Sequence, residues 1–371
     1  MSLKSREGAP AGTSTETPDA PPLGKNDAFE RRQTGLGARL ARWETLLVVL
    51  LIGVILLNIH LSPYFWNANN ILDNTSTFME IGLLTLPVTL IIIAGHIDLS
   101  VASNAAMCSI VFATLFQAGW NVWVACLAAL ALGTVAGLFN GLIVTGLRLP
   151  SLVVTLGTYA LYRGIANGVL GSGEISSFPP AFVGIDQRYV PGTHIPAPLV
   201  IFAVLAALFF VLLHMTAFGR YIYAIGNNEQ ASRFSGVAVD RIVVILFTLS
   251  GTVSALAGLV LTSRLSTARS DLATNFELAA ITAAVLGGAN IFGGEGSIPG
   301  SVLAFFVIGL LQVGMTLANI GAEIEAIAVG ALLILSILLP SLLRRARSVR
   351  SHRPHRKGGE GTRAESSTST M

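Results

Sequence analysis

Long apolar stretches separated by short polar segments dominate this chain between residues 44 and 343. A helix that crosses a hydrocarbon core of ~30 Å needs about 20 apolar residues. By that measure the pattern predicts an all-α, polytopic membrane protein with about ten transmembrane helices. The predicted spans are 44–62, 76–94, 99–118, 122–145, 150–170, 197–215, 241–263, 276–292, 300–318 and 323–343. Ser, Asn, Thr and Gly interrupt the third and the eighth of them.

Polar segments divide the chain into a transmembrane domain, residues 43–343, and two tails. Residues 1–42 are rich in Pro, Gly, Ser, Thr and charge, and residues 344–371 are polar and basic, so both tails are expected to be disordered. The N-terminal tail lacks the apolar h-region of a signal peptide. Two connections are longer than a turn. Residues 171–196 contain four prolines and predict an ordered outer loop, and residues 216–240 predict either a short surface helix or an ordinary loop.

Composition supports the membrane class, with 53% hydrophobic residues and only 12% charged residues, against about 25% charged residues in an average soluble domain. Basic residues are concentrated in the tails, which argues against a nucleic-acid surface and indicates anchors at the lipid headgroups. Excess arginine marks cytoplasmic loops. If both tails are cytoplasmic, so are Arg148, Arg220, Arg233 and Arg241. We therefore expect both termini in the cytoplasm.

The sequence contains no catalytic or phosphate-binding motif. A P-loop reads GxxxxGK[ST], and no lysine occurs between Lys25 and Lys357. Any ATP that drives this protein must therefore be bound by a partner subunit, and the chain itself needs no cofactor. HExxH and GxSxG are also absent, so an enzyme is not expected. Cys108 and Cys126 lie in apolar runs without metal-ligand spacing, and no metal site is expected.

Two glycine-rich breaks interrupt the apolar runs, and each contains a carboxylate. The first break contains Gly95, Asp98 and Ser100. The second contains Gly287, Gly288, Gly293, Gly294 and Gly296, together with Glu295. Gly-interrupted segments in corresponding positions indicate a transporter with internal repeats, although the repeat is weak here. Asp98 is interpreted either as a helix cap or as a group in the transport pathway, and we favour the cap.

Sparse polar side chains within the spans are the candidates for a substrate pathway. They are Asn140, Thr155 and Arg163, a set that suits a neutral hydroxylated solute better than a cation. Ionisable groups inside a membrane are functional candidates by default. Arg163 and Glu80 therefore either line the pathway or extend to an interface.

Over residues 44–343 the chain resembles the permease subunits of bacterial ABC importers for monosaccharides, the ribose, xylose and arabinose type. The resemblance rests on a segment that is similar to the family's GGIDLSVGS and on five further segments. These are Gly95–Ser103, followed by Leu138–Gly141, Leu149–Thr158, Tyr162–Ala166, Ala224–Gly236 and Leu286–Gly300. His96 and Ala102 replace two glycines of the first segment, which suggests a branch for deoxy-sugars such as rhamnose or for the autoinducer-2 signal.

The resemblance implies an ABC importer permease fold in the bacterial inner membrane. It implies a second permease subunit, identical or different, two cytoplasmic ATP-binding subunits and a periplasmic sugar-binding protein. In such permeases the segment similar to residues 216–240 contacts the ATPase, which assigns coupling to Asn227, Arg233 and Gly236. A branched-chain amino-acid ABC permease, an ion-coupled secondary transporter and a non-transporting membrane scaffold are the alternatives.

Overall fold

The computed structural model describes residues 43–61, 65, 68–187, 189, 193–321, 323–335 and 338, and most of these residues are helical. Both tails that the sequence predicts to be disordered, 1–42 and 344–371, lie outside the described residues.

A helix lies at each of the ten predicted stretches. The helices are α2 (Trp43–Leu61), α4 (Met79–Ile93), α5 (Val101–Gln117), α6 (Val122–Gly146), α7 (Ser151–Leu170), α9 (Ala197–His214), α12 (Val239–Leu265), α13 (Phe276–Leu286), α14 (Ile298–Leu317) and a last helix at 323–335. In the described part of the chain, α6, α9, α12 and α14 are long and apolar enough to cross a membrane, while α4, α5 and α13 are apolar but shorter. The helical membrane class is therefore confirmed, and the number of ten spans is not.

The prediction for residues 276–292 is wrong in its extent, because α13 ends at Leu286 after 11 residues. Gly288 follows with a φ of +97°, a left-handed backbone conformation that a helix cannot continue through. Residues 287–297 then run without helical structure as far as α14. The predicted span extends beyond Leu286 because Ala289, Ile291 and Phe292 are also apolar.

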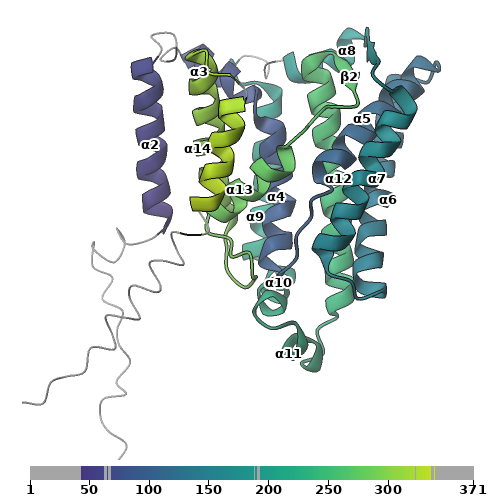
Figure 1. Cartoon of the computed structure of the whole chain (residues 1–371), viewed down its shortest axis with the longest axis vertical. Helices are drawn as coiled ribbons and strands as arrows, with labels where there is room; N and C mark the ends of the chain where they lie inside the picture. The colour runs from purple at the N-terminus through teal and green to yellow at the C-terminus, as the bar shows by residue number, and fades with distance from the viewer. Residues whose placement is uncertain are drawn as a thin grey trace, which may run out of the picture. The chain divides into compact units, whose positions relative to one another are not determined.

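Shorter elements lie at the two ends of the helix bundle (Figure 1). At one end are α3 (Ala68–Ser76), α8 (Pro180–Gln187) and an antiparallel pair of strands, β1 (Glu174–Ser176) and β2 (Thr267–Arg269). At the opposite end are α10 (Ala217–Asn227) and α11 (Glu229–Phe234). The connection at 171–196 is therefore ordered where it is described. The short helix expected from residue 227 onward corresponds to α11, and α10 precedes it.

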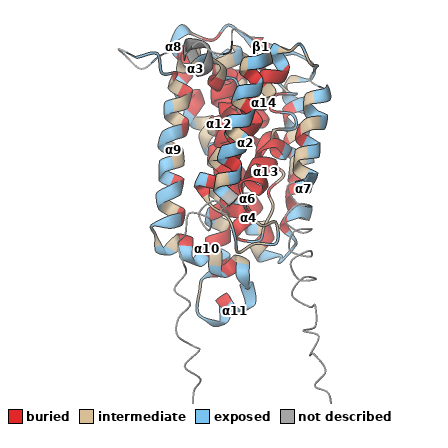
Figure 2. Cartoon of the chain, turned by 90° about the vertical axis from the view of Figure 1, so that its left-hand side faces the viewer, coloured by how far each residue is buried: buried red, intermediate tan, exposed pale blue. Residues whose placement is uncertain are grey.

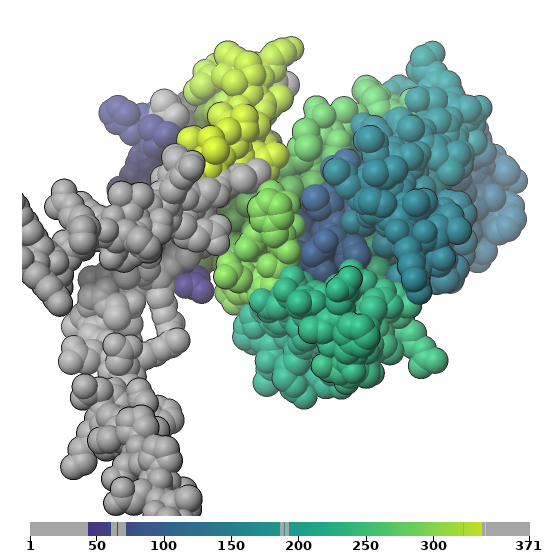
Figure 3. All heavy atoms as spheres, turned by 60° about the horizontal axis from the view of Figure 1, so that its bottom comes forward, coloured from purple at the N-terminus to yellow at the C-terminus, as the bar shows by residue number. Residues whose placement is uncertain are grey.

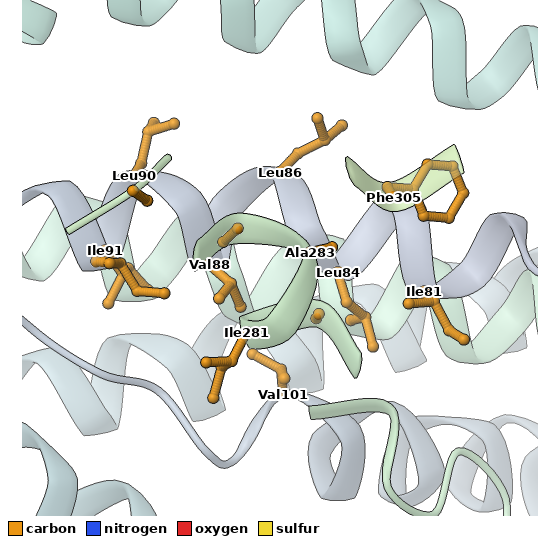
Figure 4. Close-up of a cluster of buried hydrophobic side chains, with 14 of the residues drawn as sticks. Ile81, Leu84, Leu86, Val88, Leu90, Ile91, Val101, Ile281, Ala283 and Phe305 are labelled. Carbon is orange, nitrogen blue, oxygen red and sulfur yellow. The ribbon is translucent and has the colours of Figure 1, made fainter. Parts of the chain in front are cut away.

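Helix α4 is the core of the bundle, and all 15 of its residues are buried. A helix that is apolar on every side has no face suited to solvent, and it is stable where other helices surround it. Helices α12, α13, α14 and α9 pack around α4, and the buried residues form the centre of the bundle in Figure 2. Figure 4 shows side chains of α4 next to Ile281 and Ala283 of α13 and Phe305 of α14.

Close backbone contact joins α6 to α12. A Cβ atom at Gly137 would lie 2.2 Å from the carbonyl oxygen of Phe247 and 2.9 Å from Cα of Gly251. Only glycine permits this approach, which is the usual way in which membrane helices pack without a hydrophobic driving force. The two helices are consequently in close contact along this stretch, and α12 also extends to the α10–α11 end of the bundle.

Candidate functional site

The two glycine-rich breaks meet at the α10–α11 end of the bundle. Helix α4 ends before Gly95, which has a φ of +82°, and α13 is followed by Gly293 and Gly294 with φ of +90° and +82°. The backbone N–H of Gly294 donates a hydrogen bond to the carbonyl of Ile93, 2.9 Å away, so the second break is tied to the end of α4. Two segments some 200 positions apart in sequence therefore form one unit.

Gly226 of α10 lies against both breaks. A Cβ atom at this position would be 1.9 Å from the carbonyl oxygen of Ile93 and 2.4 Å from the backbone nitrogen of Gly294. Both neighbours are backbone atoms, so neither can rotate away. Gly226 therefore contacts both of the predicted glycine-rich breaks. No role was predicted for it, because in the sequence it is only one residue of the segment Ala224–Gly236, which resembles the family.

Asp98 is fully enclosed, and its carboxyl group accepts three hydrogen bonds. The backbone N–H and the hydroxyl of Ser100 donate to Oδ1 at 2.9 and 2.7 Å, and the hydroxyl of Ser250 on α12 lies 2.8 Å from Oδ2. Ser100, not Asp98, is the N-cap residue of α5, and its side chain makes no capping bond. Asp98 therefore orders the turn that precedes α5 and joins this turn to α12.

Two of the predicted pathway residues extend this polar network. The Asn140 amide on α6 donates to the Ser100 hydroxyl at 2.8 Å, and Asn140 Oδ1 lies 3.2 Å from the hydroxyl of Tyr162 on α7. Thr155 donates to the carbonyl of Ile97 at 3.3 Å. Both side chains are buried. In this conformation their hydrogen bonds therefore join α6 and α7 to the first break.

Arg163, the third predicted pathway residue, lies apart from that network. Its Nη1 donates to the carbonyls of Ser270 and Leu272 at 2.6 and 2.8 Å, which ties α7 to the segment after β2. Its Nη2 is buried and has no hydrogen-bond partner in the described part of the chain. Buried Glu277 on α13 interacts electrostatically with Arg163.

Helices α4 and α13 each have a buried glutamate as their second residue. Glu80 follows Met79 at the start of α4, and Glu277 follows Phe276 at the start of α13. Glu80 forms an ion pair with Arg264 of α12, with 2.7 Å between Oε1 and Nε. Glu80 is a candidate from the sequence and Glu277 was not predicted, although both are carboxylates within an apolar run.

The residues predicted to couple to an ATPase surround α11. Asn227 ends α10, and its amide donates to the carbonyl of Tyr223 at 2.8 Å. Arg233 pairs with Glu229 at 2.8 Å and with Asp240, the second residue of α12, at 2.5 Å. The hydrogen bonds to Asp240 and Glu229 raise the pKa of Arg233, so it stays charged. Gly236, with a φ of +83°, forms the turn between α11 and α12.

An exposed aromatic side chain and an open cavity accompany these residues. Phe234 at the end of α11 is 92% exposed, an unusual position for a large apolar group. A cavity of about 690 Å³ lies between α11, the first break and the turn from α6 to α7, and its lining includes His96, Arg148 and Arg233. Figure 3 brings this end of the bundle forward and shows α10 and α11 projecting from it in green. This end therefore presents a charged, indented surface with an apolar side chain.

Comparison with known proteins identifies the chain. Residues 70–337 match the family described as the permease component of the branched-chain amino acid transport system. The chain belongs to this permease family. It is 40% identical over 306 residues to the Autoinducer 2 import system permease protein LsrD of Klebsiella pneumoniae, covering 81% of this chain and 92% of that protein. The LsrD protein of an Enterobacter species is 39% identical (81% and 93% covered), and that of Salmonella typhimurium is 38% identical (84% and 93% covered). No solved structure matches.

These relatives confirm the resemblance to ABC sugar-importer permeases, including the branch that imports autoinducer-2. The permease is consequently a multi-pass membrane transport protein. Among the described residues, no group of three or more His, Cys, Asp and Glu side chains is arranged to hold a metal ion. The roles assigned to individual side chains in transport and coupling stay predictions.

Proposed function

We propose that the permease imports a sugar-like, hydroxylated solute, of which autoinducer-2 and monosaccharides are the leading examples, with ATP hydrolysed by partner subunits. The observation that carries this proposal is the similarity to autoinducer-2 import permeases over more than four-fifths of the chain. A second permease subunit, identical or different, completes the pathway. Two ATP-binding subunits and a periplasmic binding protein supply energy and solute, and the permease itself binds no nucleotide.

Helices α10 and α11 are the proposed contact with the ATPase. Two physical links run from them into the bundle. Arg233 connects α11 to the start of α12, and Gly226 lies against the ends of both breaks. A partner that moves α11 would therefore act on α12, and through Ser250 on the turn held by Asp98. This arrangement suits a permease in which ATP-driven closure of the partner alternately opens the two ends of the pathway.

The proposed orientation places α10, α11 and both termini in the cytoplasm. Arg148, Arg220 and Arg233 are at the α10–α11 end, in or next to the polar connections there. Positive charge is enriched in cytoplasmic loops. At the opposite end Arg269 is paired with Asp271, whose pKa the guanidinium lowers, so this arginine adds little net charge.

We also infer that α4–α5 and α13–α14 are corresponding parts of an internal repeat. Each part begins with a short buried helix that has a glutamate at its second position, and each continues through a glycine of positive φ into a longer helix. Discontinuous helices in corresponding positions are typical of transporter repeats. The sequence similarity between the two parts is weak because most side chains differ. The left-handed glycine after each short helix and the position of its glutamate are the same in both parts.

The test is uptake by proteoliposomes that contain the permease together with its ATP-binding subunits and its periplasmic binding protein. ATP-dependent accumulation of autoinducer-2, D-ribose or L-rhamnose is the expected result. Uptake by the permease alone, driven by an ion gradient, would overturn the ABC mechanism. ATP-dependent uptake of leucine in place of every hydroxylated solute would instead establish the amino-acid alternative.

Coupling has its own test. The combined variant Arg233→Glu and Gly236→Val should leave the ATPase active and abolish most uptake, because it breaks the ion pairs of α11 and the turn after it. Arg269→Glu reverses a charge at the opposite end and is the matched control. Normal uptake by the combined variant at normal expression would show that α11 does not transmit the energy.

A further inference from the structure

A second cavity lies at the opposite end of the bundle from α10 and α11. Its volume is about 260 Å³, and it is enclosed by the end of α3, the start of α4, the start of α13, the second half of α14 and the helix at 323–335. A water molecule occupies ~30 Å³ of liquid, so the cavity is large enough for a small organic solute and far larger than a site for a single water. In the proposed orientation it opens toward the outside.

Two aromatic rings shape the cavity. Phe78 is buried, and its ring packs 5.3 Å from that of Phe305 and 6.2 Å from that of Phe306. Gly309 leaves the space that the Phe78 ring occupies, because a Cβ atom at residue 309 would lie 2.2 Å from Phe78 Cδ2. Phe276, the first residue of α13, is the other ring and is half-buried. One of the cavity's aromatic surfaces is thus held in place by close packing.

Two side-chain amides in the cavity have no hydrogen-bond partner among the residues that the structure describes. Asn74 and Gln312 both line it and are half-buried, and neither amide hydrogen-bonds to another described residue. Each amide offers two donors and one acceptor oxygen. Thr77 adds an exposed hydroxyl, which donates to the carbonyl of Asn74 at 2.7 Å and keeps its lone pairs free. The cavity therefore presents paired donors and acceptors beside a ring, the combination that matches a hydroxylated solute.

Charge in the cavity separates the candidate ligand classes. None of the described residues that line it is Lys, Arg or His. A free amino acid would bring a carboxylate without a partner, which is costly to desolvate. Glu325 is the lone carboxylate of the lining, and its Oε1 already accepts a hydrogen bond from Thr316 at 2.9 Å. A cation would therefore find one shared carboxylate, which is weak ligation.

From these contacts we propose that this cavity is a binding site for the transported solute, of the neutral polyhydroxyl class, at the outer end of the pathway. The inference rests on the proposed function and deepens it by naming the solute class and the residues that hold it. Asn74 and Gln312 bond to solute hydroxyls, and the half-buried ring of Phe276 covers an apolar face of the solute. The predicted pathway residues Asn140 and Thr155 are committed to bonds within the protein and do not line this cavity.

A thiol-protection experiment tests the site in the complete transporter reconstituted with its ATPase and binding protein. The two native cysteines are buried, so a cysteine introduced by Thr77→Cys is the accessible thiol for a membrane-impermeant methanethiosulfonate reagent. Autoinducer-2 or D-ribose should slow its modification by about tenfold, and leucine should not. Ser172→Cys, in an exposed turn after α7 and outside the lining, is the control whose rate should not change.

Amide removal provides the second measurement. Asn74→Ala and Gln312→Ala should each lower uptake by about tenfold, the factor that one lost hydrogen bond gives. Gln117→Ala removes an exposed amide at the end of α5, outside the lining, and should not change uptake. An unchanged labelling rate of Thr77→Cys in the Gln312→Ala background verifies that the variant is folded.

The outcomes separate this site from the proposed function. If the transporter takes up a hydroxylated solute, yet the solute does not protect Thr77→Cys or the alanine variants transport normally, the cavity is not the binding site and the function stands. If the wild-type complex takes up no hydroxylated solute, the proposed function fails and the site fails with it.

Discussion

The bond between Ser250 and Asp98 gives the sharpest prediction about this permease. Ser250→Ala removes the hydroxyl that lies 2.8 Å from Asp98 Oδ2 and leaves this buried oxygen without its described partner. Leaving a buried acceptor unsatisfied costs about 1–3 kcal/mol, more than the same hydroxyl contributes in an exposed position. Because the bond joins residues 152 positions apart, its loss also loosens the contact between the first break and α12.

Ser254→Ala is the matched control, one turn further along the same helix. Ser254 is equally buried, and its hydroxyl donates to the backbone carbonyl of Ser250 at 2.7 Å, a bond within α12. Both partners of that bond belong to α12, so the bond joins no separate parts of the protein. Its loss should lower the free energy of unfolding by less than about 1 kcal/mol. Each variant removes one buried hydroxyl from α12. The two hydroxyls differ in their hydrogen-bond partner, which is Asp98 of the first break for Ser250 and a carbonyl of α12 itself for Ser254.

Thermal unfolding of the purified permease in detergent, followed by tryptophan fluorescence, measures the difference. For a domain of about 300 residues, a loss of about 2 kcal/mol corresponds to a fall of about 3 °C in the melting temperature, and the melting temperature of Ser254→Ala should fall by less than half as much. In an Asp98→Asn background the effect of Ser250→Ala should change, because residues in one network are not additive. Equal melting temperatures for Ser250→Ala and Ser254→Ala would refute the assignment of Asp98 as the group that joins the break to α12.

Three further predictions concern other contacts. Gly226→Ala should reduce folded yield strongly, since its Cβ would lie 1.9 Å from a backbone carbonyl of α4, whereas Gly53→Ala, with no atom within 4 Å, should be neutral; detergent-extracted monodisperse protein measures both. Glu80→Gln should lower the free energy of unfolding by about 3 kcal/mol, because a charge on Arg264 loses its partner in the bundle, and a double variant with Arg264→Gln should recover part of that loss. Phe234→Ala should change the melting temperature by less than about 2 °C, since the side chain is 92% exposed, yet reduce ATP-driven uptake several-fold if this residue binds the ATPase; unchanged uptake would remove it from the contact.

The hydrophobic pattern predicted where helices form, but not how each one ends or what surrounds it. Each apolar stretch contains a helix because a long apolar segment satisfies its own backbone within a membrane only as a helix. The end of α13 was missed because the pattern weighs side chains, while the helix stops for a backbone reason, the left-handed conformation at Gly288. Helix α10 was missed because its alternation of polar and apolar residues is also typical of a loop.

The sequence shows which polar residues are candidates for function, but it does not show which residues they contact. Asp98, Asn140 and Thr155 are polar groups in apolar surroundings, which the sequence shows directly. Their partners lie on other helices, and no local pattern states which face of a helix meets which neighbour. Ser250 and Gln312 received no role because a single serine or glutamine in a span is common, and its significance depends on a contact or a cavity made by distant segments.

The position of Gly226 explains why the two breaks and α10 have to be considered as one mechanical unit. One glycine lies against the end of α4 and the second break together, so α10 cannot shift without displacing at least one of them. The ion pair of Arg233 with Asp240 adds a separate link from α11 to α12, the helix that bonds to the first break through Ser250. A force on α11 therefore reaches α4 by two independent routes. Since α4 and α13 both begin at the end of the bundle where the smaller cavity lies, movement of these short helices would change that cavity directly.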